Sequence, residues 1–243
     1  MAKKRDVPVH GRKSARFHRA RKKRYLVVAG GAVTEKQYFK RLASIYDVVI
    51  EYQQKNESPE HLADFARKLK EEDERDISTD CYEKIWVVVD VDDFHGHSQA
   101  AKICKDNGIE LIISNPCFEV WLLDHVSVCP PSFTLTSTVE SAAAKAGIVG
   151  GNRNKYVNVE LIDSEHLDAA IRNAERHNTA GNRQGRNTLA PHHEQEYAPW
   201  TDLPKVIETL KSNKQSCKEK HGSTHPGKFR KPLHRYSHWT RSR

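Results

Sequence analysis

Long hydrophobic runs are missing from this 243-residue sequence. No segment approaches the roughly 20 consecutive apolar residues that a membrane-spanning helix needs. The first residues form a basic string with few apolar side chains, unlike the charged start and hydrophobic centre of a signal peptide. We therefore expect a protein that has no membrane span and resides in the cytoplasm.

Cysteine pairs and nucleotide-binding motifs are also lacking. The five cysteines include no C-x-x-C pair, which argues against a disulfide framework or a zinc ribbon and favours reduced thiols. The fourteen histidines do not show usual zinc spacings, since His95 and His97 flank a glycine, and His192 and His193 are adjacent. No phosphate loop of the form G-x-x-x-x-G-K-S/T occurs.

Positive charge is abundant but concentrated at the two ends. The formal net charge is +8, yet residues 1–24 hold eleven Lys and Arg and one acidic residue, and residues 211–243 hold ten and one. The segment between them carries 19 basic and 30 acidic residues, a net charge of −11. Such ends favour contact with nucleic-acid phosphates, because each Lys or Arg contact releases counterions. The alternative is docking on an acidic partner or on the acidic body of the protein.

Strand-like and helix-like segments alternate through the first half of the chain, which predicts an α/β fold with a mostly parallel sheet flanked by helices. Thr34 is expected to cap the first helix after the turn at Gly30 and Gly31. Asn115 and Pro116 are expected to begin a later helix. The predicted strands are residues 25–29, 48–52, 84–90 and 109–114.

The strand signal fades after Pro130 and Pro131. Helical patterns cover residues 136–146, 163–177 and 200–211, with a long polar loop at 178–199. We expect this half to be a helical appendage beside the sheet. The expected organisation is therefore a disordered basic tail (1–24), one domain (25–210) and a second basic tail (211–243).

Several carboxylates follow predicted strands. Asp90, Asp92 and Asp93 come directly after the most hydrophobic one, and Asp90 and Asp92 share a face because strand side chains alternate. Glu35 and Glu119 lie in the first turns of helices that follow two other strands. The carboxyl ends of parallel strands meet at one edge, where carboxylates can hold Mg²⁺ or Mn²⁺ beside a phosphate. The alternative is that these residues form turns and favour helix starts.

Three stretches together resemble the RloB-like family associated with abortive-infection phage defence, whose sheet is similar to the Toprim fold of topoisomerases, primases and related nucleases. They are YLVVAGGAVTEKQYF at 25–39, WVVVDVDDF at 86–94 and SNPCFEVWLLDH at 114–125. Weaker matches, AAIRNA at 169–174 and PWTDLPKVIETL at 199–210, extend the likeness over residues 25–210.

The resemblance implies a metal-dependent phosphodiesterase controlled by an ATPase partner protein. Asp90 and Asp92 would hold Mg²⁺ or Mn²⁺, with Asp93 beside them and Glu35 and Glu119 as further ligands or proton-transfer groups. The family's first motif has glutamates where this chain has Gly30 and Ala32. Glu35 takes over the missing role, Glu119 completes the site, or cleavage is weakened or lost.

These readings leave alternatives of different classes. The chain is a nuclease acting on RNA, particularly transfer RNA, or on DNA, or else a non-catalytic binding subunit of a defence complex. A small-nucleotide regulator that uses Gly30 and Gly31 as a phosphate cradle is a weaker third reading, because the G-x-G-x-x-G pattern is absent. The sequence leaves the oligomeric state open, a homo-oligomer included.

Overall fold

The computed structural model describes residues 21–91, 96–179 and 197–222. Its main element is a five-stranded sheet in the order β2-β1-β3-β4-β7. The pairings β1–β2, β1–β3 and β3–β4 are parallel, and β4–β7 is antiparallel. The predicted mostly parallel α/β sheet is therefore confirmed. The strands are β1 (Arg24–Ala29), β2 (Val49–Gln54), β3 (Lys84–Asp90), β4 (Glu110–Asn115) and β7 (Trp200–Thr201).

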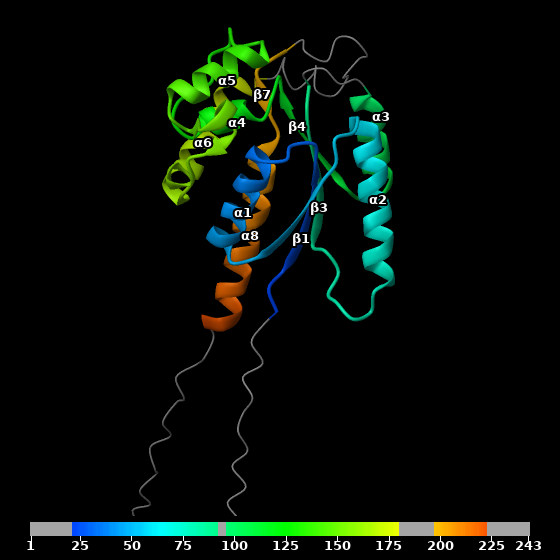
Figure 1. The fold of residues 1–243 in the computed structure, drawn as a ribbon. Helices are drawn as coiled ribbons and strands as arrows, with labels where there is room; N and C mark the ends of the chain where they lie inside the picture. The colour runs from blue at the N-terminus through cyan, green and yellow to red at the C-terminus, as the bar shows by residue number, and fades with distance from the viewer. Residues whose placement is uncertain (1–20, 92–95, 180–196, 223–243) are drawn as a thin grey trace, which may run out of the picture.

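Helices cover both faces of the sheet, as Figure 1 shows. On one face α1 (Thr34–Tyr46) and α8 (Leu203–Gly222) form a core with one set of strand side chains. On the other, α2 (Pro59–Arg75) and α3 (His97–Asp106) pack on the alternate set. Because β3 alternates Trp86 and Val88 with Val87 and Val89 between two cores, it is buried on both sides.

The second half of the chain packs beside α1 and α8 (Figure 1). Its helices are α4 (Glu119–Asp124), α5 (Thr136–Lys145) and α6 (Ser164–His177), with the short turns η1 (Asn152–Asn154) and η2 (Val159–Leu161). Strands β5 (Val149–Gly150) and β6 (Tyr156–Val157) form a small antiparallel hairpin. This arrangement matches the expected helical appendage, with the hairpin as an addition.

The end of the described chain differs from the prediction. Trp200 lies in β7 rather than in a helix, because residues 200–201 pair with the exposed edge of β4. Helix α8 begins at Leu203 and continues past residue 211, where a tail was predicted. Asn213 explains part of this extension, since its side chain donates to Tyr25 Oη at 2.6 Å. Residues 1–20 and 223–243, the rest of the predicted tails, lie outside the described residues.

Although α8 is the longest helix described, neither it nor any other helix in the described segments is long and apolar enough to cross a membrane.

Two predicted helix caps are wrong. Thr34 is already the first residue of α1, and its hydroxyl donates to the carbonyl oxygen of Lys155 at 3.2 Å. Asn115 ends β4 and α4 begins only at Glu119. A residue before proline is biased towards extended backbone, which favours Asn115 as the end of a strand rather than as a cap.

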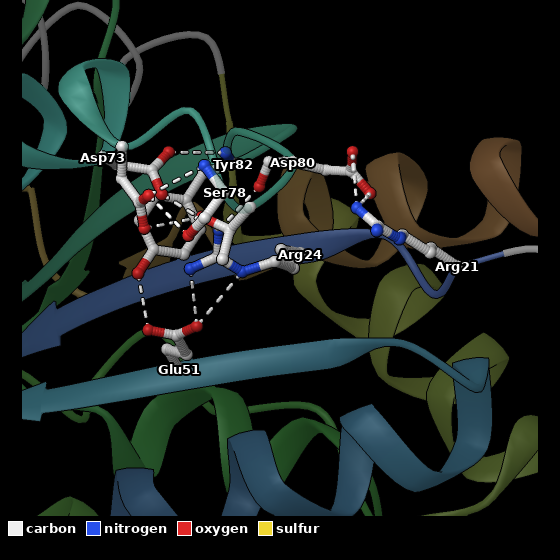
Figure 2. A network of polar contacts seen from close by, with 9 residues as sticks. Arg21, Arg24, Glu51, Asp73, Ser78, Asp80 and Tyr82 are labelled. Atoms are coloured by element: carbon white, nitrogen blue, oxygen red, sulfur yellow. Dashed lines mark hydrogen bonds and ion pairs between the residues drawn. The ribbon is translucent and has the colours of Figure 1, made fainter.

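Arg24 holds the amino end of the sheet together (Figure 2). Its guanidinium lies 2.8 Å from Glu51 Oε1 on β2 and 3.0 Å from Asp73 Oδ1 on α2. It also donates to the carbonyl oxygen of Asp80 at 2.6 Å and lies over the ring of Tyr82, 4.3 Å from its centroid. One side chain therefore joins β1, β2, α2 and the connection to β3.

Candidate functional site

A pocket of about 340 Å³ opens at the carboxyl edge of β1 and β3, between the sheet and the second half of the chain. Because these strands are parallel, the segments that follow them meet here. The β1–α1 turn contributes residues 30–35, β3 contributes Asp90, and the β4–α4 connection contributes Cys117 and Glu119. Its acidic side chains among the described residues are Glu35, Glu57, Asp90, Glu119 and Glu140.

Three of the predicted site residues line this pocket: Glu35, Asp90 and Glu119. The other two, Asp92 and Asp93, lie outside the described residues. The backbone that carries Asp90 is fixed on two sides. His97 Nε2 donates to the carbonyl oxygen of Asp90 at 2.7 Å, and Val91 N donates to the carbonyl oxygen of Pro116 at 3.0 Å.

The carboxyl group of Glu35 lies over Gly31. A Cβ atom at residue 31 would lie 1.8 Å from Glu35 Oε2, so only glycine leaves room for this conformation. Burial and the nearby charge of Glu119 raise the pKa of Glu35 to about 7, although its backbone N–H and Lys155 act in the opposite direction. Glu35 therefore changes protonation near neutral pH.

Gly30 has no comparable steric reason to be glycine. A Cβ atom there would meet nothing nearer than the carbonyl oxygen of Lys55, at 3.8 Å, which is ordinary van der Waals contact. Gly30 lines the pocket, and its backbone is not in the left-handed region that favours glycine. The backbone at this position can therefore accept a Cβ atom without a steric clash.

The sequence did not indicate two further pocket residues, Lys155 and Glu140. Lys155 Nζ lies 3.0 Å from Glu140 Oε1 and 3.8 Å from Glu119 Oε1, and Glu119 is only 5% exposed. Burial lowers the pKa of Lys155, but the negative charges of Glu119, Glu140 and Glu35 outweigh it and raise that pKa. Lys155 is thus a fixed cation in an acidic pocket.

The thiol of Cys117 also lines the pocket. Burial raises its pKa well above the usual value, and the charges of Glu119 and Asp90 add to the effect. A thiol in these surroundings stays protonated at neutral pH, so it does not supply a thiolate nucleophile.

The donor set fits a hard divalent cation. Glu35, Asp90 and Glu119 line one space with carboxylate oxygens, and the charge of Glu119 raises the pKa of Glu35 by more than the charge of Lys155 lowers it. Within the segments that the structure describes, no three His, Cys, Asp or Glu side chains already form a metal-binding group. Glu35, Asp90 and Glu119 would be the residues that hold such a cation.

The fold and the pocket define an α/β protein with an acidic pocket at the carboxyl edge of a mostly parallel sheet. The family model for RloB-like protein matches residues 25–210, and the chain belongs to this family. The family resemblance predicted from the sequence is confirmed over the same range. Comparisons with curated proteins and with solved structures gave no match.

Proposed function

We propose that this protein is a metal-dependent phosphodiesterase that cleaves nucleic acid: RNA, particularly transfer RNA, or DNA. The observation that carries the proposal is the meeting of Glu35, Asp90 and Glu119 in one pocket at the carboxyl edge of parallel strands. These side chains come from the first turn of α1, the end of β3 and the start of α4. Ligand sites in open α/β sheets occur at this edge, and a Toprim-like nuclease would use carboxylates there.

Asp90 is the proposed metal ligand on β3, with Asp92 as its partner and Asp93 beside them. When bound, Mg²⁺ or Mn²⁺ would polarise a phosphoryl oxygen and lower the pKa of a bound water. Glu35 is the proposed second ligand or general base, because a pKa of about 7 suits proton transfer at neutral pH. Glu119 orients Lys155, whose ammonium faces the pocket and suits contact with a phosphate.

The resemblance to the RloB-like family supports a role in abortive-infection antiviral defence, in the cytoplasm and together with an ATPase partner. The basic ends suit attraction of RNA or DNA to a body that is itself acidic, because long-range charge raises the rate of encounter. Both statements belong to the proposal.

A second candidate function is a catalytically inactive subunit that binds nucleic acid or a partner protein. Gly30 favours it, because the position that carries a glutamate in the family's first motif carries no carboxylate here. The ion pair between Lys155 and Glu119 also offsets charge that a metal would otherwise offset.

The test compares the native protein with Gly30→Glu and Gly30→Gln on a mixed pool of RNA and DNA, with Mn²⁺ or with a chelator. A Cβ atom at Gly30 meets no steric clash, and the glutamate and glutamine side chains differ in charge and little in size. Asp92→Ala serves as the variant that lacks one of the proposed metal ligands. Thermal melting checks that all four proteins are folded.

Mn²⁺-dependent cleavage by the native protein that Asp92→Ala abolishes is the expected result, and it means that Glu35 or Glu119 suffices. Cleavage by Gly30→Glu, with none by the native protein or by Gly30→Gln, supports the second candidate as a decayed nuclease. No cleavage by either the native protein or Gly30→Glu overturns the phosphodiesterase proposal.

A further inference from the structure

The β5–β6 hairpin, residues 149–157, forms part of the pocket wall through Lys155. The proposed function assigns a role to Lys155 but none to the other residues of this hairpin. Besides Lys155 it presents two exposed side chains of different character, the guanidinium of Arg153 and the ring of Tyr156. The exposed fraction of Tyr156 is 56%, which is high for a tyrosine.

Hydrogen bonds fix the hairpin to the helix that carries Glu35. Thr34 Oγ1 donates to the carbonyl oxygen of Lys155 at 3.2 Å, and Val157 N donates to Gln37 Oε1 at 3.2 Å. At the base of the hairpin, Asn158 N donates to the carbonyl oxygen of Ile148 at 2.8 Å. The hairpin therefore keeps a defined position relative to the carboxylates of the pocket.

The ring of Tyr156 is supported from below. A Cβ atom at Gly151 would lie 2.6 Å from Tyr156 Cδ2, so the ring packs directly on the backbone of this glycine. Gly151 has a φ of 70°, which also favours glycine. The Cδ2 side of the ring is thus held by the hairpin itself, while more than half of the side chain remains exposed to solvent.

The hairpin is basic within an acidic body. Residues 149–157 include Arg153 and Lys155 and no acidic residue, whereas residues 25–210 carry a net charge of −11. A polyanion that approaches the pocket is repelled by most of this body and attracted by this segment. Basic side chains on the same short segment as an exposed aromatic ring are a combination that binds single-stranded nucleic acid, where bases stack on the ring.

We propose that the β5–β6 hairpin binds the single-stranded segment of a nucleic-acid substrate, with a base stacked on Tyr156 and a backbone phosphate at Arg153. Lys155 would then receive the next phosphate at the pocket wall. Single strands are favoured over duplexes because stacking on a side chain requires a base face that is not already stacked. This inference deepens the proposed function and takes its substrate class from it.

The experiment measures binding of the full chain to labelled single-stranded RNA, single-stranded DNA and duplexes by fluorescence anisotropy. A chelator is present throughout, so that binding is recorded without any cleavage. The variants are Tyr156→Ala, Tyr156→Phe and Arg153→Ala. Matched controls are Arg75→Ala and Ile77→Ala, because both residues are exposed at the far end of α2. Titration over a range of salt concentrations separates the contribution of the basic ends.

We expect Tyr156→Ala to weaken single-strand binding about tenfold, which is the usual size of one base–aromatic contact, and Tyr156→Phe to change it less than about twofold. Arg153→Ala should lower the salt slope by about one phosphate contact. Duplex binding and both controls should stay near the native value. A photocrosslink from an iodouracil-containing oligonucleotide should map to residues 149–157.

Native affinity in both Tyr156→Ala and Arg153→Ala overturns the proposal, and so does a crosslink confined to other segments. An equal loss of duplex binding overturns the single-strand preference. If the native protein binds no nucleic acid, the hairpin has no such role. If hairpin variants lose binding while neither the native protein nor Gly30→Glu cleaves, the hairpin proposal stands and the phosphodiesterase proposal alone fails.

Discussion

Carboxylates cluster at both ends of the sheet, but the pKa shifts of Glu51 at one end and Glu35 at the other have opposite directions. At the amino end, Arg24 forms ion pairs with Glu51 and Asp73 (Figure 2). Burial raises the pKa of Glu51, but hydrogen bonds from Tyr82 and Arg24 outweigh it, and the net shift is downward. At the carboxyl end, burial and the charge of Glu119 raise the pKa of Glu35 to about 7.

The difference separates a structural cluster from a candidate functional one. Carboxylates that are fully hydrogen-bonded stabilise a fold in their ionised form, as at Arg24. A raised pKa means that the ionised form of a carboxyl group is disfavoured by its surroundings. Such groups are common in pockets where a protein binds a cation or transfers a proton. The comparison predicts that equal substitutions at the two ends will have unequal consequences.

The largest expected effect is on cleavage, from Asp90→Asn. This change keeps the shape of the side chain and removes the charge that would hold a metal, so Mn²⁺-dependent cleavage should fall about 100-fold or more. The melting temperature should change little, because the amide has nearly the same size and shape as the carboxylate that it replaces. Initial rates and thermal melting measure the two quantities. Asp106→Asn, at an exposed position at the end of α3, is the control and should keep the native rate.

The matched change at the amino end is Asp73→Asn, which should destabilise the fold by about 2 kcal/mol. The side chain of Asp73 is only 8% exposed and accepts hydrogen bonds from Arg24 and from Tyr82 N at 2.9 Å. Urea denaturation measures the loss, and the cleavage rate per folded molecule should stay unchanged. Asp64→Asn on the same helix is the control, because its pairs with Arg67 and Lys68 are exposed and contribute little. A large rate effect of Asp73→Asn would remove the distinction between the ends.

The sequence predicts an element of the fold where the hydrophobic pattern is long enough to show a period. Strands β1, β3 and β4 have apolar, β-branched runs, and parallel connections then force the residues after them to one edge. For this reason the sequence predicts that Glu35, Asp90 and Glu119 lie at the same edge of the sheet. The short strand β7 was missed, because a two-residue segment is too short to show a period.

Lys155 and Glu140 could not be predicted in the same way. Lys155 lies in a polar hairpin with no hydrophobic period, 120 residues from Glu35, and packing alone brings it to Glu119. The caps at Thr34 and Asn115 failed for a related reason. Thr34 donates to a distant backbone carbonyl, and Pro116 keeps Asn115 extended. Contacts between distant parts of the chain, which local sequence preferences do not reveal, determine the positions of these side chains.

A smaller effect is expected from pH. The pKa of Glu35 in the folded protein, about 7, lies above its ordinary value of 4.5. Between these values the folded protein binds a proton that the unfolded chain has released, so stability should fall as pH rises through this window. Glu35→Gln has no such proton to lose and should be more stable than the native protein at pH 8, by about 1 kcal/mol, since partial exposure weakens the effect.

The measurement is the free energy of unfolding at several pH values in a chelating buffer. At pH 4 the native protein and Glu35→Gln should be nearly equal, because Glu35 is then protonated in both states. Glu51→Gln at the amino end should show the opposite sign, with lower stability at neutral pH, because it removes an ionised partner of Arg24. Equal pH profiles for the native protein and Glu35→Gln would contradict the raised pKa.

The smallest effect should separate two adjacent glycines, Gly30 and Gly31. In Gly31→Ala the new methyl group meets the carboxyl end of Glu35, which is flexible enough to move away, so stability changes little while Glu35 leaves its position. In Gly30→Ala the methyl group makes an ordinary van der Waals contact and should stabilise the fold by about 0.5 kcal/mol, because it restricts the unfolded chain. Urea denaturation measures both variants, and the pH profile of unfolding reports on Glu35.

Only Gly31→Ala should lose the fall in stability towards neutral pH, since only there is Glu35 displaced from the buried position beside Glu119. The same fall in both variants would mean that the raised pKa does not depend on the position of Glu35 over Gly31.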